Sequence, residues 1–521
     1  MNLRLHPNTC RIALGCLLAS LHVASAAADT AAPSPPRMPR LAPDYTDIVL
    51  PPNIAPMNFI IQEDGARFRT RLSGPAGSPI DLAGRSPRVA IPIRPWNDLL
   101  RANVGSHILI EIAVLSREGE WFEFQAVTNR VAPDELDGHL VYRRLLPLYN
   151  IYRTMGIYQR DLETFKETPV LENTRFGRGC LNCHTFLQHS PDHMALHIRT
   201  QDSGNPMLLI ASNQVATVAK TSGYMSWHPS GRLLAASANK LSLFFHTKGE
   251  TRDVFDADSD LGIYRVDSNT VVSPPAIARP DRLETWPCWA PDGRALYFSS
   301  APKLGNMDRR RFRQVRYDLM RVAYDLELDR WGEPETIVSA EATARSAVQP
   351  RVSPDGRFLV YGLCAYGHFP IYQPSSDLHL LDLATREHRR LDINSDAADT
   401  WHCWSSNGRW LVFSSKRLDG LFARPFFTHV DPAGRFSKPF LLPQRDPAYF
   451  DSCIETFNVP ELIRSPITVS PADLARAATR PKRLLKPAIQ TPAQGGAPAP
   501  VREYEDAHTE QRQPPASGTT D

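Results

Sequence analysis

Two cysteines and a histidine lie within one pentapeptide, Cys180-Leu181-Asn182-Cys183-His184. Thiols at this spacing can each form a thioether with one vinyl group of the same porphyrin, and the histidine that follows then lies beneath the iron. The pentapeptide is therefore typical of covalent haem attachment. We predict that Cys180 and Cys183 bind a single haem c and that His184 is the proximal iron ligand.

Two other kinds of site use cysteines at this spacing. A structural zinc site would need a second C-x-x-C or H-x-x-x-H pair at a workable distance along the chain. A thioredoxin-like dithiol would need a βαβ pattern around the cysteines. Neither pattern is visible in the sequence, so haem attachment is the favoured interpretation.

The first 28 residues have the pattern of a secretory signal peptide. Arg4 and Arg11 precede an apolar run at 12–23, and small residues at 24–28 offer A-x-A cleavage sites. The run is shorter than the roughly 20 residues of a membrane-spanning helix, so we expect no transmembrane anchor after cleavage. Because bacteria attach haem c after export, both signals predict a periplasmic protein that is a substrate of the haem attachment machinery.

Composition divides the remaining chain into segments. A formal net charge of +3 and 42% hydrophobic residues are ordinary for a globular protein and give no reason to expect a nucleic-acid partner. Proline and alanine at 29–44 predict a linker. Short extended runs separated by turn residues predict a small β-rich region at 45–139. A tail at 463–521, rich in proline, alanine, glutamine and charge, is predicted to be disordered.

The middle of the chain repeats a short glycine-containing phrase. Its four copies lie at 227–232, 289–294, 352–357 and 404–409. Their glycines, at 231, 293, 356 and 408, are 62, 63 and 52 residues apart by subtraction. Each copy predicts a hairpin, because glycine supplies the positive φ that a tight turn between two strands requires. Further strands follow in each copy, and four-stranded units repeated this way close radially into an all-β propeller.

These phrases resemble the W-S-P-D-G-R repeats of TolB-like β-propellers, which are related in architecture to WD-repeat proteins. A second likeness extends further along the chain. The runs at 155–162, 180–186, 227–231, 404–410 and 438–444 are similar to a family of exported bacterial propeller proteins that carry one C-x-x-C-H. This resemblance covers most of the chain from about 51 to 462. It implies a propeller with one haem c and no particular reaction, because that family has no settled activity.

The haem attachment segment, 176–200, fits the repeat. If 180–186 forms the innermost strand of a blade, three more apolar runs follow before the next blade begins at Trp227. The haem would then lie at a mouth of the propeller. Together with the four marked blades and one built from 140–171, this gives about six blades within 140–462, and 449–462 is free to close the ring. A seventh blade would require a contribution from the N-terminal region.

Four further cysteines, Cys288, Cys364, Cys403 and Cys453, belong to the predicted exported chain. Cys288 and Cys403 occupy the same position in two copies of the repeat. We expect them to lie in different blades, too far apart for a disulfide. All four are interpreted as small buried strand residues.

The sixth iron ligand decides whether a haem only transfers electrons or also reacts with small ligands. Candidates near His184 are His189, His193, Met194, His197 and His228, and His402 could also face the channel. We favour His197 or Met194, because both also match positions of the resembled family. The alternative is that both are ordinary strand residues.

Three classes of function are compatible with these features. The first, which we favour, is an electron-transfer protein that serves a periplasmic redox partner. The second is a haem enzyme with an open iron position, such as a peroxidase or a small-molecule reductase. The third is a TolB-like interaction scaffold with a structural or sensory haem. The chain is larger than a simple electron shuttle requires, so the second and third remain open.

Overall fold

The computed structural model describes residues 36–146, 154–200, 204–220, 222–244, 252–305 and 311–490, without the side chains of 243 and 244. The predicted signal peptide, the first part of the predicted linker and residues 491–521 lie outside these ranges. The described residues from 38 onward belong to one compact unit. No helix among the described residues is long and apolar enough to span a membrane.

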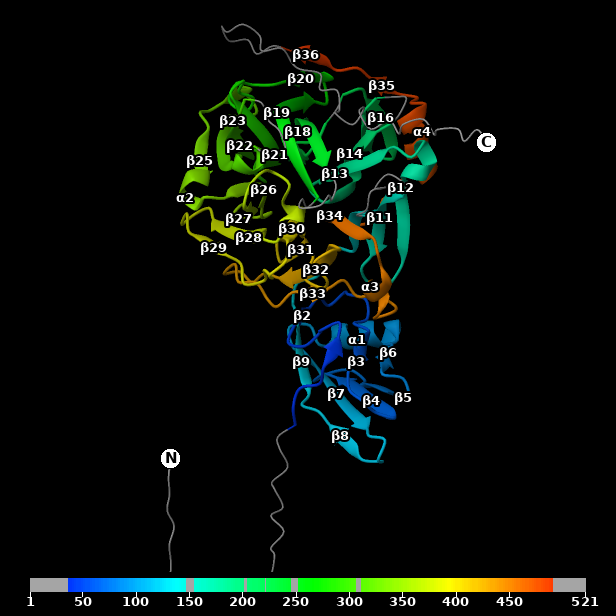
Figure 1. The fold of residues 1–521 in the computed structure, drawn as a ribbon. Coiled ribbons are helices and arrows are strands. Elements are labelled where there is room, and N and C mark those ends of the chain that lie inside the picture. The colour runs from blue at the N-terminus through cyan, green and yellow to red at the C-terminus, as the bar shows by residue number, and fades with distance from the viewer. Residues whose placement is uncertain are drawn as a thin grey trace, which may run out of the picture. The chain divides into compact units, whose positions relative to one another are not determined.

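Six sheets of four or five strands form the blades of a propeller (Figure 1). Blade 1 consists of β34 (Thr456–Ile463), β10 (His139–Leu145), β11 (Met155–Asp161) and β12 (Glu167–Glu172). Blade 2 consists of β13 (Cys180–Leu187), β14 (Ser190–Arg199), β15 (Met207–Ala211) and β16 (Gln214–Val218). Blade 3 consists of β17 (Met225–Trp227), β18 (Leu233–Phe244), β19 (Asp253–Arg265) and β20 (Thr270–Val272).

The remaining blades follow the same plan. Blade 4 consists of β21 (Arg282–Trp289), β22 (Ala295–Pro302), β23 (Asp318–Asp325), β24 (Arg330–Trp331) and β25 (Glu335–Val338). Blade 5 consists of β26 (Ser346–Val352), β27 (Phe358–Cys364), β28 (Asp377–Asp382) and β29 (His388–Arg390). Blade 6 consists of β30 (Asp399–Trp404), β31 (Trp410–Ser415), β32 (Arg424–His429) and β33 (Phe440–Leu441).

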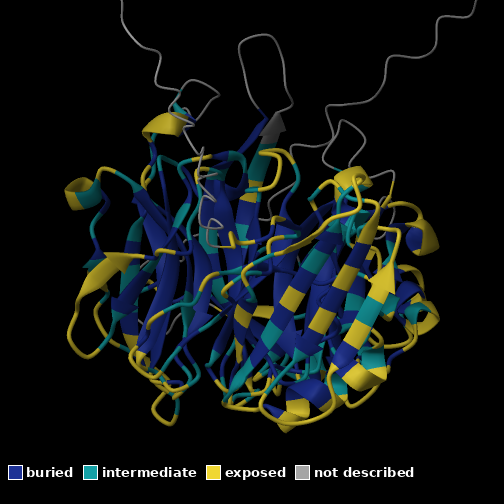
Figure 2. Ribbon diagram, turned by 90° about the horizontal axis from the view of Figure 1, so that it is seen from below, coloured by how far each residue is buried: buried dark blue, intermediate teal, exposed yellow. Residues whose placement is uncertain are grey.

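The innermost strands form a closed ring. Each contacts the next, in the order β34, β13, β17, β21, β26, β30 and back to β34. β34, the last propeller strand in the sequence, closes the ring, because it pairs with β10, the first propeller strand in the sequence. Ile463 lies opposite His139 in this pairing. The predicted propeller of about six blades, closed by the segment at 449–462, is thus confirmed. Figure 2 shows that the strands are mostly buried and the connecting loops mostly exposed.

The repeat glycines occupy equivalent turns between the first and second strands of blades 3 to 6. Gly231, Gly293, Gly356 and Gly408 all have φ between 67° and 73°. In each turn the glycine N–H donates to the carbonyl three residues earlier, as Gly356 does to Ser353 at 2.8 Å. Only glycine adopts this backbone conformation at little cost.

Replacing Gly356 by valine should lower the free energy of unfolding by about 1 kcal/mol or more. The cost comes from the backbone, because an added Cβ would lie 3.7 Å from the nearest atom of Pro291, an ordinary contact. Gly84→Val on β5 (Ile80–Gly84) is the matched control, since its φ is not positive and its added Cβ has room. Urea unfolding of both variants tests this, and equal losses would contradict it.

The N-terminal region forms its own sheets and adds no seventh blade among the described residues. One sheet contains β2 (Val49–Leu50), β9 (Val127–Val131), β7 (His107–Leu115), β8 (Trp121–Glu123), β4 (Arg67–Ser73) and β5, and the other contains β1 (Leu41–Ala42), β3 (Phe59–Ile61) and β6 (Arg88–Val89). The region packs on blade 6, where the Trp410 indole donates to the carbonyl of Asp134 at 3.1 Å.

Two features of the N-terminal region correct the sequence prediction. The helix α1 (Ile93–Ala102) was not foreseen, and it buries Trp96, Leu99 and Leu100 on one face at helical spacing. The predicted linker at 29–44 also extends too far, because β1 pairs with β3 and Leu41 is buried. The apolar Leu41 joins the core in spite of the prolines around it.

The predicted disordered tail begins too early. Residues 463–490 contain α4 (Pro471–Thr479), β35 (Leu484–Leu485) and β36 (Ala488–Gln490). The Ser470 hydroxyl caps α4 by accepting from the N–H of Asp473 at 3.1 Å. β35 and β36 then add fifth strands, parallel to β16 and β20. The alanines of this segment suggested a disordered tail from composition. Alanine is also the strongest helix former, and its small side chain lets a helix pack closely against its neighbours.

Blades 3 and 4 contain the buried carboxyl groups of Asp256 and Glu284. Burial raises the pKa of Asp256 to about 7. Burial, together with the charge of Asp260, raises the pKa of Glu284 to about 8. Both groups therefore retain protons near neutral pH to a far greater extent than exposed carboxyl groups do.

We expect Glu284→Gln to gain stability relative to the unmodified protein as the pH rises from 6 to 9. A carboxyl group with a raised folded-state pKa stabilises the fold at low pH and loses that contribution as the pH rises through about 8. Glutamine does not titrate. Urea unfolding at both pH values measures the difference, with the exposed Glu123→Gln as control. A difference that does not change with pH would contradict the prediction.

Candidate cofactor-binding cavity

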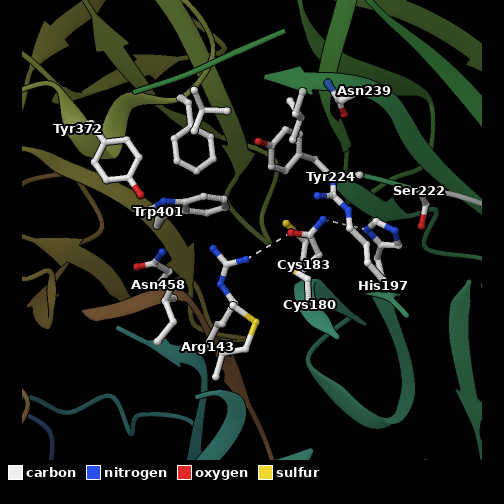
Figure 3. A pocket seen from close by; sticks show the side chains of 18 of the residues that line it. Arg143, Cys180, Cys183, His197, Ser222, Tyr224, Asn239, Tyr372, Trp401 and Asn458 are labelled. Carbon is white, nitrogen blue, oxygen red and sulfur yellow. Dashed lines mark hydrogen bonds between the residues drawn. The ribbon is translucent and has the colours of Figure 1, made fainter. Parts of the chain in front are cut away.

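A cavity lies at one end of the propeller channel, and Figure 3 shows the side chains that line it. Cys180, Trp401 and Asn458 belong to its lining and stand at or near the first residues of β13, β30 and β34. The cavity therefore lies where these innermost strands begin. This agrees with the prediction that the pentapeptide forms the innermost strand of a blade.

Both cysteines of the pentapeptide line this cavity, and neither forms a disulfide. In a regular strand, residues three positions apart face opposite sides of the sheet. The pairing of β13 with β14 is irregular between Leu181 and His184, which allows both thiols to face the cavity. Burial raises the pKa of the Cys183 thiol to about 11, so it remains protonated at neutral pH.

His184 is buried in the same blade but is not among the residues that line the cavity. Neither ring nitrogen has a hydrogen-bond partner of normal geometry among the described residues, although the backbone of Val141 lies close. Burial, with a smaller contribution from the charge of Arg143, lowers the pKa of His184 to about 3. Its imidazole is therefore neutral, which is the form that binds a metal ion.

His197 and Met194 lie on opposite faces of β14. His197 lines the cavity, where its Nδ1 accepts from Asn182 Nδ2 at 3.0 Å and its Nε2 has no partner among the described residues. Met194 belongs to a hydrophobic cluster that also contains Leu196, Ile198 and Cys180, but it is not among the residues that line the cavity. The structure thus brings His197 to the cavity together with Cys180 and Cys183, whereas Met194 shares a hydrophobic cluster with Cys180 and does not line the cavity.

The other candidate histidines do not line the cavity. His189 and His402 contact the carbonyls of Leu462 and Val360 at 2.9 Å through one ring nitrogen each. His228 contacts Ser230 and Gly293 through both ring nitrogens. Of the histidines considered, only His197 therefore faces the cavity.

Aromatic side chains that the sequence analysis did not single out lie at one wall: Tyr224 and Trp401 line the cavity, and Trp286 packs against both. The rings of Tyr224 and Trp286 are stacked with their centroids 3.4 Å apart, and the Trp401 ring lies edge-on to Trp286 at 5.0 Å. All three pack with Cys183 in one buried cluster. Each stands seven residues before a repeat glycine (231 − 224, 293 − 286 and 408 − 401). The repeat spacing was therefore the signal that could have located them.

Most of the innermost strands share a local irregularity, a residue of positive φ, which changes the direction of the side chains there. Trp286, Gln349, Trp401 and Val459 all have positive φ, between 49° and 57°. Strand pairing shifts beside each of the first three. Such β-bulges turn side chains out of the regular alternation, and strained residues of this kind cluster at functional sites.

The thiols and imidazoles at this cavity are groups that can hold a haem, whereas the cavity in this conformation is too small for one. The pentapeptide supplies two thiols and a neutral imidazole without a partner of normal geometry, and His197 adds a ring nitrogen, Nε2, that has no hydrogen-bond partner among the described residues. The cavity offers only about 90 Å³ to the centres of water-sized molecules. Ligand pockets of about 300–1,000 Å³ are usual for larger molecules, so the described walls would have to move apart for a porphyrin.

Fold and site together define a six-bladed β-propeller with a cysteine-lined cavity at one end of its channel. A search with family models found no match, and neither did a search of curated proteins. A comparison with solved structures found weak likenesses, and these concern only the fold.

The chain is similar to hydrazine synthase from Kuenenia stuttgartiensis, with 14% identity over 49% of this chain and a TM-score of 0.29. The match spans 64% of that chain, less than two thirds of its length. The chain is also similar to the propeller domain of the Trilobed protease from Pyrococcus furiosus, with 13% identity over 64% of this chain and 90% of that domain, and a TM-score of 0.32. These scores are too low to carry an argument, so the propeller assignment rests on the strand pairing.

Proposed function

We propose that the protein carries one covalent haem c and transfers electrons between redox partners in the periplasm. The observation that supports this most directly is the position of the pentapeptide. Cys180 and Cys183, predicted as attachment sites from their spacing alone, both line one cavity together with His197. Export through the predicted signal peptide would bring the chain to the haem attachment machinery.

Each residue has a defined role in this proposal. The thiols of Cys180 and Cys183 would hold the porphyrin through thioethers to its two vinyl groups, and the neutral imidazole of His184 would be the proximal iron ligand. His197 offers its Nε2 from the neighbouring strand. When bound, the haem supplies one-electron redox chemistry. Two protein ligands would hold the iron geometry nearly constant between oxidation states, which favours electron transfer.

An optical spectrum of the protein, produced together with haem attachment machinery, tests the proposal. We expect the spectrum of a low-spin haem c in both oxidation states, with little change when carbon monoxide is added after reduction. A high-spin spectrum with rapid carbon monoxide binding would instead favour a haem enzyme. The absence of any haem spectrum would refute the proposal.

A further inference from the structure

Arg143 on β10 is a buried cation in the cavity wall, with 7% of its surface exposed. Its Nη1 donates to Leu181 O at 3.3 Å and to Asn182 Oδ1 at 3.4 Å. In the amide orientation that satisfies both polar groups of Asn458, Asn458 Oδ1 accepts from Nη2 at 3.2 Å. Nε has no partner. Figure 3 shows this guanidinium directed toward the pentapeptide.

These contacts compensate the charge of Arg143 poorly. All three acceptors are neutral, and their distances exceed the 2.9–3.0 Å that is usual for such hydrogen bonds. A buried charge is costly unless an opposite charge or several good hydrogen bonds accompany it. An anionic group in the cavity would supply both, because a guanidinium binds oxyanions with parallel hydrogen bonds.

The remaining lining fits an anion rather than a cation. Two more arginines, Arg199 and Arg252, also belong to the lining, and both take part in other interactions. No carboxylate belongs to the lining that the structure describes. His197, which is also in the lining, is fully buried.

The cavity also limits the size of the ligand. About 90 Å³ is open to the centres of water-sized molecules. One water needs at least about 10–15 Å³ by this measure, so several waters or one small oxyanion fit, whereas a porphyrin does not without movement of the walls.

We propose that Arg143 makes this cavity a binding site for a small oxyanion or a carboxylate group. The anion has two potential sources, a free oxyanion from solution or a carboxylate of the haem itself. If the anion is a carboxylate of the haem, this inference rests on the proposed function. If it is a free oxyanion, the inference does not depend on the proposed function.

The test begins with the full-length protein made free of haem by Cys180→Ser with Cys183→Ser. Sodium nitrite is titrated into it calorimetrically at constant ionic strength, and sodium acetate is the carboxylate probe. We expect saturable binding that Arg143→Gln weakens at least tenfold and Arg143→Lys weakens less. Arg232→Gln, on an exposed arginine paired with Asp267, is the control and should leave binding unchanged. Circular dichroism and thermal unfolding establish that each variant is folded.

The same titration of the haem-loaded protein separates the two sources. Loss of nitrite binding on haem loading, with a lower reduction potential in Arg143→Gln, assigns the site to the haem carboxylates. Retained binding assigns it to a free oxyanion. If the haem-free protein binds neither probe, or if folded Arg143→Gln binds as well as its parent, the inference is wrong. A protein that binds nitrite through Arg143 but never takes up haem would refute only the proposed function.

Discussion

Replacing Cys180 and Cys183 together by serine should abolish covalent haem attachment. Each thioether requires one of these thiols, and both line the same cavity, so no other described cysteine can replace them there. The unmodified protein, produced with haem attachment machinery and then denatured, should keep a pyridine haemochrome spectrum of c type. The double variant should show none, which is the largest change that any substitution in this chain is expected to cause.

A second double variant controls for general damage to the propeller. Cys288 and Cys403 are also buried thiols on innermost strands, in blades 4 and 6. Neither lines the cavity, and serine is close to cysteine in size, so Cys288→Ser with Cys403→Ser should retain haem. Unmodified protein that binds zinc and shows no Soret band under the same conditions would contradict the assignment of the pentapeptide.

The propeller could be predicted from the sequence because its turns require a particular residue type at a fixed position. A positive φ at a fixed position of every hairpin selects glycine, so Gly231, Gly293, Gly356 and Gly408 report the blade spacing. The closing strand was predictable for a related reason. A ring of blades must join its two ends, and the apolar segment before 462 was not needed by any other blade.

Other elements could not be predicted because their signals were local and ambiguous. The helix α1 spans only ten residues, and its apolar face became apparent only from what it buries. The alanines of α4 support both a disordered tail and a packed helix, and the propeller surface decided between them by providing a cluster in which Leu474 and Ala478 are buried. The composition of a segment alone does not show whether the rest of the fold offers a surface on which that segment can pack.

The candidate site was predictable in part. The spacing of Cys180 and Cys183 singled out two residues that line the cavity, although their role there stays a prediction. Strand alternation would have separated Met194 from His197, since residues three apart in a regular strand face opposite sides. Arg143 could not be found in this way. It lies on the second strand of the neighbouring blade and belongs to neither the pentapeptide nor the repeated phrase, so no motif marks it.

His197→Ala should convert the haem-loaded protein from a six-coordinate, low-spin state to a five-coordinate, high-spin state. His197 is the only one of the two favoured ligand candidates that lines the cavity, and its Nε2 has no partner among the described residues. Without it, the sixth position would be open to small ligands. The reduced variant should therefore bind carbon monoxide rapidly, whereas the unmodified protein should not.

The hydrogen bond of His197 sharpens this prediction. To bind iron through Nε2, the neutral imidazole must carry its proton on Nδ1, which now accepts from Asn182 Nδ2 at 3.0 Å. The Asn182 amide must then present its oxygen instead, and a donor–acceptor pair of this kind fixes the orientation of a ligating histidine. Asn182→Leu should therefore weaken the bond to iron, giving a partly high-spin spectrum between those of the unmodified protein and His197→Ala.

Two matched variants decide whether the effect is specific. Met194→Leu conserves an apolar side chain in the cluster that holds Met194, and should leave the near-infrared charge-transfer bands in the positions of bis-histidine ligation. His228→Ala removes a histidine that is bound to Ser230 and Gly293 outside the cavity, and should leave the spin state unchanged. If Met194→Leu instead produced the high-spin state, β14 in the haem-loaded protein would have to present its other face to the iron, and the distal ligand would be methionine.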